Sequence, residues 1–144
     1  MFKENMIAPC GLNCSICSQA LRKENPCTGC LGPNETKSEY CATQCKIAKC
    51  EIRKTLPDIY CDQCPQYPCS EIVDKEIWYA NTYPMIESLM RNLALLRKEG
   101  MKKFLQQEEE RWTCPVCNGI ISVHTGICSG CEKEYSNRTN KRRQ

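Results

Sequence analysis

The chain has 144 residues, of which 15 are cysteine and only one is histidine, and its formal net charge is +3. Its length allows one ordinary domain or two very small ones, and cysteine at about a tenth of the residues excludes a scaffold held together by hydrophobic burial alone. The small net charge, with acidic and basic residues interspersed, neither requires nor excludes a nucleic-acid partner.

The cysteines are predicted to bind metal instead of forming disulfides. No stretch is apolar enough for a signal peptide or a membrane span, so we expect a cytoplasmic protein that does not enter the membrane. Thiols stay reduced in the cytoplasm, and an odd number of cysteines cannot all pair. The predicted metal ligands are Cys10, Cys14, Cys17, Cys27, Cys30, Cys41, Cys45, Cys50, Cys61, Cys64, Cys69, Cys114, Cys117, Cys128 and Cys131.

Residues 1–70 hold eleven of these cysteines, mostly in close pairs with few large apolar residues between them. This pattern predicts a cysteine-rich multi-zinc module built of loops and short helices. Asn13 is placed to cap a short helix over residues 18–24. Good helix formers return over residues 41–55 and end before Pro57.

Two further groups in this module have the spacing of metal knuckles. Cys27 and Cys30 form a C-x2-C pair in which Gly29 permits a tight bend. Residues 61–69 contain another C-x2-C pair and a third thiol, stiffened by two prolines. Eleven thiols fill two four-ligand zinc sites with three left over, or three sites if one takes another ligand or shares a bridging thiolate.

Residues 71–111 are predicted to form a helical connector. Ser70 is placed to cap its first short helix. From Pro84, which is acceptable in a first turn, the apolar residues follow the spacing of an amphipathic helix. Gly100 either separates two helices here or kinks a single one. The apolar stripe must be buried, either against the N-terminal module or in a homodimer.

Residues 112–135 have the most specific motif, C-x2-C-x10-C-x2-C around a β-type run at 120–124. Two knuckles flanking a hairpin predict a zinc ribbon whose four thiolates close a structural site. His124 lies between the knuckles and either packs there, replaces a cysteine or supports a ligand. Residues 136–144 are predicted to form a basic, flexible tail.

The predicted fold class is therefore small α+β and metal-stabilised, with about three to four zinc ions per chain. Each structural zinc contributes about 10 to 16 kcal/mol, so we expect the cysteine-rich module to be unfolded without metal. An iron–sulfur cluster is the alternative cofactor, because Cys10, Cys14 and Cys17 have the spacing used by radical enzymes that cleave S-adenosylmethionine. Those enzymes resemble barrels of roughly 200 residues or more, for which this chain is too short.

Several motifs together resemble one prokaryotic family. These are APCGLNCSIC at 8–17, CTGC at 27–30, CDQCPQYPC at 61–69 and RWTCPVC at 111–117. They are similar to the cysteine-rich family catalogued as domain of unknown function 3795. The resemblance implies a zinc-binding cytosolic protein of bacteria or archaea, and it supplies no catalytic residue.

The function that these features favour is a non-enzymatic zinc module that binds a protein or a nucleic acid, with no catalytic residue assigned. Aromatic residues that could contact a partner are Tyr67, Trp78, Tyr79 and Trp112. One alternative is an iron–sulfur redox protein, and another is a zinc enzyme with an incomplete site near Asp62 or Glu71. A third is a thiol store or metal carrier.

Overall fold

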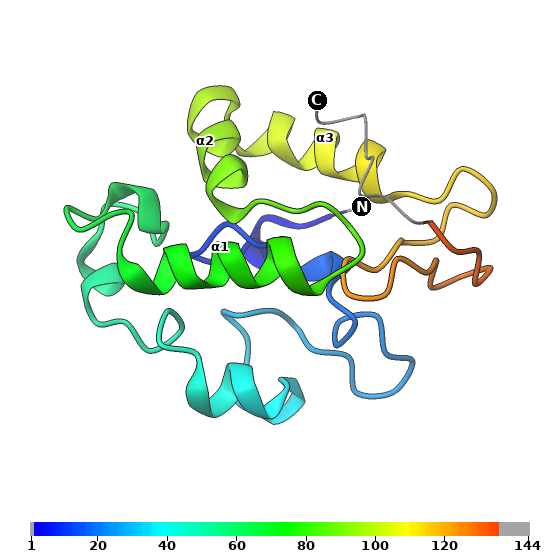
Figure 1. Ribbon diagram of the computed structural model, residues 1–144, viewed down its shortest axis with the longest axis horizontal. Helices are drawn as coiled ribbons and strands as arrows, with labels where there is room; N and C mark the ends of the chain where they lie inside the picture. Colours follow the sequence, from blue (N-terminus) through cyan, green and yellow to red (C-terminus); the bar gives the residue numbers. More distant parts are fainter. Residues whose placement is uncertain (1, 136–144) are drawn as a thin grey trace.

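Three α-helices are the largest regular elements of the computed structural model, which describes residues 2–135. They are α1 (Ser70–Thr82), α2 (Leu89–Glu99) and α3 (Met101–Trp112). In Figure 1, α1 runs across the middle of the molecule, α2 and α3 lie above it, and the segment around residues 20–50 lies below it. Helix α2 contacts both α1 and α3.

The ends of α2 are set by two polar side chains and a glycine. Ser88 Oγ accepts a hydrogen bond from the backbone N–H of Arg91 (3.1 Å) and caps the helix. The carboxylate of Glu76, in α1, accepts from the N–H groups of Leu89 (2.9 Å) and Met90 (3.1 Å). Gly100, with φ of +88°, separates α2 from α3, so the two-helix alternative is correct.

Two helix boundaries differ from the prediction. The second amphipathic stretch begins at Leu89, not at Pro84, because the N-cap hydrogen bonds form at Ser88 and Glu76. Helix α1 contains Ser70 as its first residue, and its N-cap position is Cys69, which makes no side-chain capping hydrogen bond.

The N-terminal segment consists of turns and single helical turns. They are 3-10 turns at Glu4–Met6, Cys14–Ile16, Asn34–Thr36, Ile52–Thr55 and Cys61–Gln63 and a π-type turn at Tyr40–Gln44. Asn13 Oδ1 does cap a turn, accepting from the N–H of Ser15 (3.0 Å). The helices predicted over residues 18–24 and 41–55 are wrong. In the first, the N–H groups of Ala20 and Leu21 donate to the carbonyl of Cys17 (3.0 and 3.1 Å) and form one turn, but the carbonyl of Gln19 accepts from the N–H of Cys27 (3.0 Å), so the turn does not continue as a helix.

The C-terminal segment forms antiparallel contacts without extended strands. Its isolated bridges pair Thr113 with Ile120, Ile121 with Cys128 and Ile127 with Glu134. Within residues 2–135 no strand longer than a bridge occurs, so the α+β class and a strand-based ribbon are not confirmed. The structure is small and mainly helical, with a cysteine cluster near its C-terminal end.

The core joins cysteines from both parts of the chain to the helices. Its larger cluster includes Cys10, Cys14, Cys45, Cys114 and Cys128 together with buried aliphatic and aromatic side chains. A smaller cluster contains Ile7, Tyr60, Leu93, Leu96 and Phe104. Both clusters therefore bury the apolar stripe of α2 and α3 within the chain, against N-terminal residues.

None of the helices described in residues 2–135 is long and apolar enough to cross a membrane. The predicted basic tail, 136–144, lies outside the described residues.

Candidate metal centre

The four C-terminal cysteines converge on one point. The sulfur atoms of Cys114, Cys117, Cys128 and Cys131 all lie within 4.8 Å of one another. The sulfurs of Cys114 and Cys131 are 3.7 Å apart, and those of Cys117 and Cys128 are 3.4 Å apart. A tetrahedron with zinc–sulfur bonds of about 2.3 Å has an edge of roughly 3.8 Å. The set can therefore hold one metal ion in tetrahedral geometry.

Backbone N–H groups point at two of these sulfurs. Gly119 donates to Cys117 Sγ and Gly130 donates to Cys128 Sγ, each over 3.3 Å. A Cβ at Gly119 would lie 2.9 Å from Cys128 Sγ, and one at Gly130 would lie 2.9 Å from Cys117 Sγ, so glycine is needed at both turns. Hydrogen bonds to an ionised acceptor are stronger than those to a neutral one, so this arrangement stabilises metal-bound thiolates.

Tyr135 makes Cys114 a more acidic thiol than Cys117. The hydroxyl of Tyr135 lies 3.0 Å from Cys114 Sγ, and this hydrogen bond is the main cause that lowers the pKa of Cys114 to about 6. The N–H of Gly119 favours the thiolate of Cys117, but hydrogen bonds with Cys128 and other thiols and burial outweigh it and raise that pKa to about 11. A cation is needed to ionise all four thiols together.

His124 is not one of the ligands. The backbone N–H of Ser18 donates to its Nδ1 (3.1 Å), which leaves the proton on Nε2, 3.2 Å from the hydroxyl oxygen of Tyr79. Burial, followed by the nearby charge of Lys75, lowers the pKa of His124. Both ring nitrogens are engaged, and the imidazole ties the C-terminal segment to α1.

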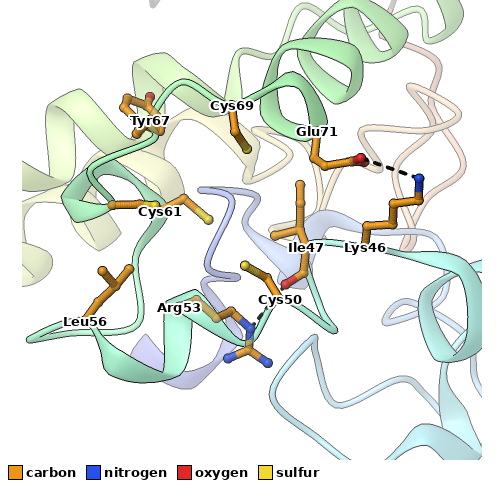
Figure 2. Close-up of a pocket in the computed structure, with 10 residues that line it drawn as sticks. Lys46, Ile47, Cys50, Arg53, Leu56, Cys61, Tyr67, Cys69 and Glu71 are labelled. Carbon is orange, nitrogen blue, oxygen red and sulfur yellow. Dashed lines mark hydrogen bonds and ion pairs between the residues drawn. The ribbon is translucent and has the colours of Figure 1, made fainter.

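A second group of cysteines surrounds a cavity of about 60 Å³ in the N-terminal half, here called the four-thiol chamber. Its cysteines are Cys50, Cys61, Cys64 and Cys69. Figure 2 shows the sulfur atoms of Cys50, Cys61 and Cys69 turned toward the same space. Lys46 and Arg53 also line it, and Arg53 is fixed by hydrogen bonds to the carbonyls of Ile47 (3.2 Å) and Ala48 (2.7 Å).

The other N-terminal cysteines surround a separate cavity of about 50 Å³, here called the seven-thiol chamber. They are Cys10, Cys14, Cys17, Cys27, Cys30, Cys41 and Cys45. Lys37 and Lys75 also line this chamber, and Lys75 Nζ lies 3.8 Å from Cys45 Sγ. The two cavities share no lining cysteine, and Cys61 of the four-thiol chamber lies near Cys10 of the seven-thiol chamber.

The chamber thiols differ from the C-terminal cluster in spacing. In the described part of the chain, only one group of three or more candidate ligand atoms lies within 4.8 Å of one another, and it consists of Cys114, Cys117, Cys128 and Cys131. Burial, and then neighbouring thiolates, raise the pKa of Cys30 to about 11 and that of Cys61 to about 12. Cys30 and Cys61 are therefore neutral near pH 7 unless a cation binds.

The two carboxylates predicted near an incomplete site are both in ion pairs. Asp62 accepts two hydrogen bonds from Arg97, over 2.8 and 2.9 Å. Glu71 lines the four-thiol chamber and lies 3.6 Å from Lys46 Nζ. Only Glu71 is thus positioned beside a group of thiols.

The family model described as "Protein of unknown function (DUF3795)" matches residues 6–74. The match includes the eleven N-terminal cysteines and ends within α1, so α2, α3 and the C-terminal cluster lie outside it. No curated protein and no solved structure matches the chain.

Proposed function

We propose that this chain, whose residues 6–74 belong to the family of unknown function DUF3795, is a multi-zinc, non-enzymatic module that binds another macromolecule. The observation that carries the proposal is the convergence of four C-terminal thiols within 4.8 Å. Zinc accepts four thiolates in tetrahedral geometry, and a site filled by four protein ligands leaves no position for water or substrate. Such a site is structural.

Metal analysis of the full chain tests the zinc part of this proposal. Protein purified with and without oxygen should contain about three to four zinc ions per chain and no visible absorption. Iron with the absorption of an iron–sulfur cluster would replace the proposal by its redox alternative. Ready transfer of all the zinc to a mild chelator, with the helices retained, would favour a metal carrier instead.

The surface of α1 supports a protein partner. Val73, Ile77 and Trp78 are 36%, 52% and 57% exposed; Val73 and Ile77, four residues apart, share one face of the helix, and Trp78 lies next to Ile77 on the adjacent face. Of the aromatic residues proposed to contact a partner, Tyr79 and Trp112 are buried in the core, so Trp78 is the strongest remaining candidate. An exposed apolar patch is a contact surface for a protein more than for phosphate groups.

Binding measurements separate the two kinds of partner. A nucleic-acid site predicts affinity for short single-stranded and duplex DNA or RNA that falls steeply between about 50 and 200 mM salt. For a protein partner, Trp78→Gln with Ile77→Ser should abolish capture that the wild type shows at equal zinc content. Ile52, which is exposed elsewhere, offers a matched control through Ile52→Ser.

The enzyme alternative has its own test at Glu71. A metal-assisted hydrolytic or transfer reaction needs an open metal position with an acid or base beside it. Glu71→Gln should leave both metal content and partner binding unchanged if the protein is a binding module. Loss of a response to a metabolite at unchanged metal content would favour catalysis instead, and Asp62→Asn, outside the chambers, is the control.

A further inference from the structure

The division of the eleven N-terminal thiols into two chambers has a consequence for metal stoichiometry, and the inference rests on the proposed zinc function. We infer that the four-thiol chamber binds one zinc ion, and that the seven-thiol chamber binds two zinc ions that share one bridging thiolate. With the C-terminal cluster, the full chain then holds about four zinc ions.

The backbone around both chambers repeats the arrangement found at the C-terminal cluster. There, the N–H of the second residue after Cys117 and after Cys128 donates to the cysteine sulfur over 3.3 Å. In the seven-thiol chamber Gly29 donates in the same way to Cys27 Sγ over 3.4 Å. In the four-thiol chamber Gln66 donates to Cys64 Sγ, also over 3.4 Å. Each chamber therefore contains a turn shaped like those that surround four converging thiols.

The number of thiols in each chamber matches whole tetrahedra. Four thiolates complete the coordination of one zinc ion. Two zinc ions that share one thiolate require seven in total, which is the number of cysteines around the second cavity. A single zinc ion there would leave three further thiols lining the same space without a metal. Two zinc tetrahedra that share one thiolate use every cysteine of the chamber.

The neighbours of each thiol indicate which one is shared. Cys14 lies near Cys10, Cys30 and Cys17, whose charges would act on its thiol if they were ionised. Cys30 in turn lies near Cys10 and Cys45. From this proximity we assign one group of four to Cys10, Cys14, Cys30 and Cys45.

The remaining three cysteines form a second, incomplete group. Cys17 lies near Cys41 and Cys27. Cys17 follows the single turn Cys14–Ile16, and its backbone N–H donates to the carbonyl of Cys14 (3.1 Å). Cys14 therefore belongs to the first group and adjoins the second, and it is the bridging ligand.

Charge compensation also fits this assignment. Seven thiols that bind two divalent ions release seven protons and keep a net excess of three negative charges. Lys75 points its ammonium group at Cys45 and, in the part of the chain described, forms no ion pair with a carboxylate. Lys37 lies at the same chamber and donates to the carbonyl of Cys30 (2.7 Å). Two lysines thus offset most of the excess charge.

Replacement of zinc by ¹¹³Cd²⁺ in the full chain tests the inference without any mutation. Each cadmium site gives one NMR resonance, and two ions that share a thiolate split each other's resonances. We expect four resonances, of which two are split by mutual coupling and two are single. Three single resonances, or four without splitting, would overturn the shared site while leaving the proposed zinc function intact. A chain that binds neither zinc nor cadmium would overturn both.

Three variants assign the resonances. Cys14→Ser should abolish the splitting and leave the two single resonances in place. Cys64→Ser should remove one single resonance and keep the coupled pair, and Cys117→Ser should remove the other. Retention of the splitting in Cys14→Ser would contradict the role given to Cys14. If that variant does not fold, the splitting in the wild-type chain and its retention in Cys64→Ser still decide the inference.

Discussion

The Nε2 atom of His124 lies 3.2 Å from the hydroxyl oxygen of Tyr79, so the loop between the two C-terminal cysteine pairs is attached to α1. One residue earlier, the N–H of Val123 donates to the carbonyl of Ile16 over 2.9 Å. Ile16 lies between Cys14 and Cys17 of the seven-thiol chamber. The C-terminal cluster and the N-terminal cysteines are therefore parts of one hydrogen-bonded core.

The buried imidazole should make stability depend on pH. Burial lowers the pKa of His124, so the unfolded chain takes up its proton at a higher pH than the folded chain. The stability contributed by neutral His124 is present above about pH 6.5 and is lost as the pH falls from there toward the folded pKa, with a slope of at most about 1.4 kcal/mol per pH unit. Urea unfolding of the wild type and of His124→Gln measures this slope.

His124→Gln should show a shallower pH dependence than the wild type between about pH 5.5 and 7.5. Because acid also releases metal from thiolates, the zinc content is measured at each pH and only points with equal zinc are compared. Parallel curves for the two proteins would show that His124 does not titrate in the way inferred here.

Tyr135 is predicted to strengthen metal binding at the C-terminal cluster. Its hydroxyl, 3.0 Å from Cys114 Sγ, favours the thiolate. Loss of a hydrogen bond to a metal ligand typically weakens binding by about 10 to 100-fold. In Tyr135→Phe, one zinc per chain should be released at lower chelator concentration than in the wild type, as followed by native mass spectrometry. Tyr40→Phe, at an exposed tyrosine, should behave like the wild type.

Removal of one partner from the buried ion pair between Arg111 and Glu87 should cost far more stability than removal of a partner from a surface pair. Arg111 Nη1 lies 2.9 Å from Glu87 Oε1, and their side chains are 3% and 0% exposed. Arg111→Met removes the guanidinium from buried carboxylates and should lower the free energy of unfolding by about 3 to 5 kcal/mol. Chemical denaturation measures this difference.

Arg97→Met is the matched control. Arg97 pairs with Asp58 and Asp62, but its side chain is 42% exposed. Removal of this pair should cost only about 1 kcal/mol or less, because solvent screens exposed charges. Similar losses in the two variants would contradict the distinction between the buried and the exposed pair.

Substitutions at two glycines distinguish the cost of backbone strain from the cost of steric conflict. Gly11 and Gly100 both have positive φ, +94° and +88°. A Cβ at Gly11 would lie 2.4 Å from the carbonyl oxygen of Leu89, whereas one at Gly100 would meet nothing within 4 Å. Gly100→Ala should therefore cost only the backbone strain of an alanine at positive φ and a ψ of 160°, about 1 to 3 kcal/mol.

Gly11→Ala should cost more than Gly100→Ala, by at least about 1 kcal/mol, because α2 must also move away from the N-terminal loop. Thermal and urea unfolding of the two variants give the comparison. Equal losses would mean that the loop at Gly11 shifts without cost and is not held against α2.

Local sequence determined the features that depend on neighbouring residues. The spacing C-x2-C-x10-C-x2-C was sufficient to predict four converging thiols, because each pair spans a single turn. Gly100 marked the boundary between α2 and α3, and Asn13 marked a capped turn, since both depend on the backbone within a few residues. The helix expected over 18–24 failed because the carbonyl of Gln19 accepts from the N–H of Cys27 (3.0 Å), so only one turn forms after Cys17.

Tertiary structure alone decided how the other eleven thiols are divided. Cys45 and Cys50 are close in sequence but line different chambers, whereas Cys10 and Cys45 are far apart in sequence and line the same one. His124 could likewise have been a ligand by its position, yet its ring is held by Ser18 and Tyr79. Spacing fixes which thiols share a turn, but long-range packing of turns against α1 and α2 fixes which turns share a cavity.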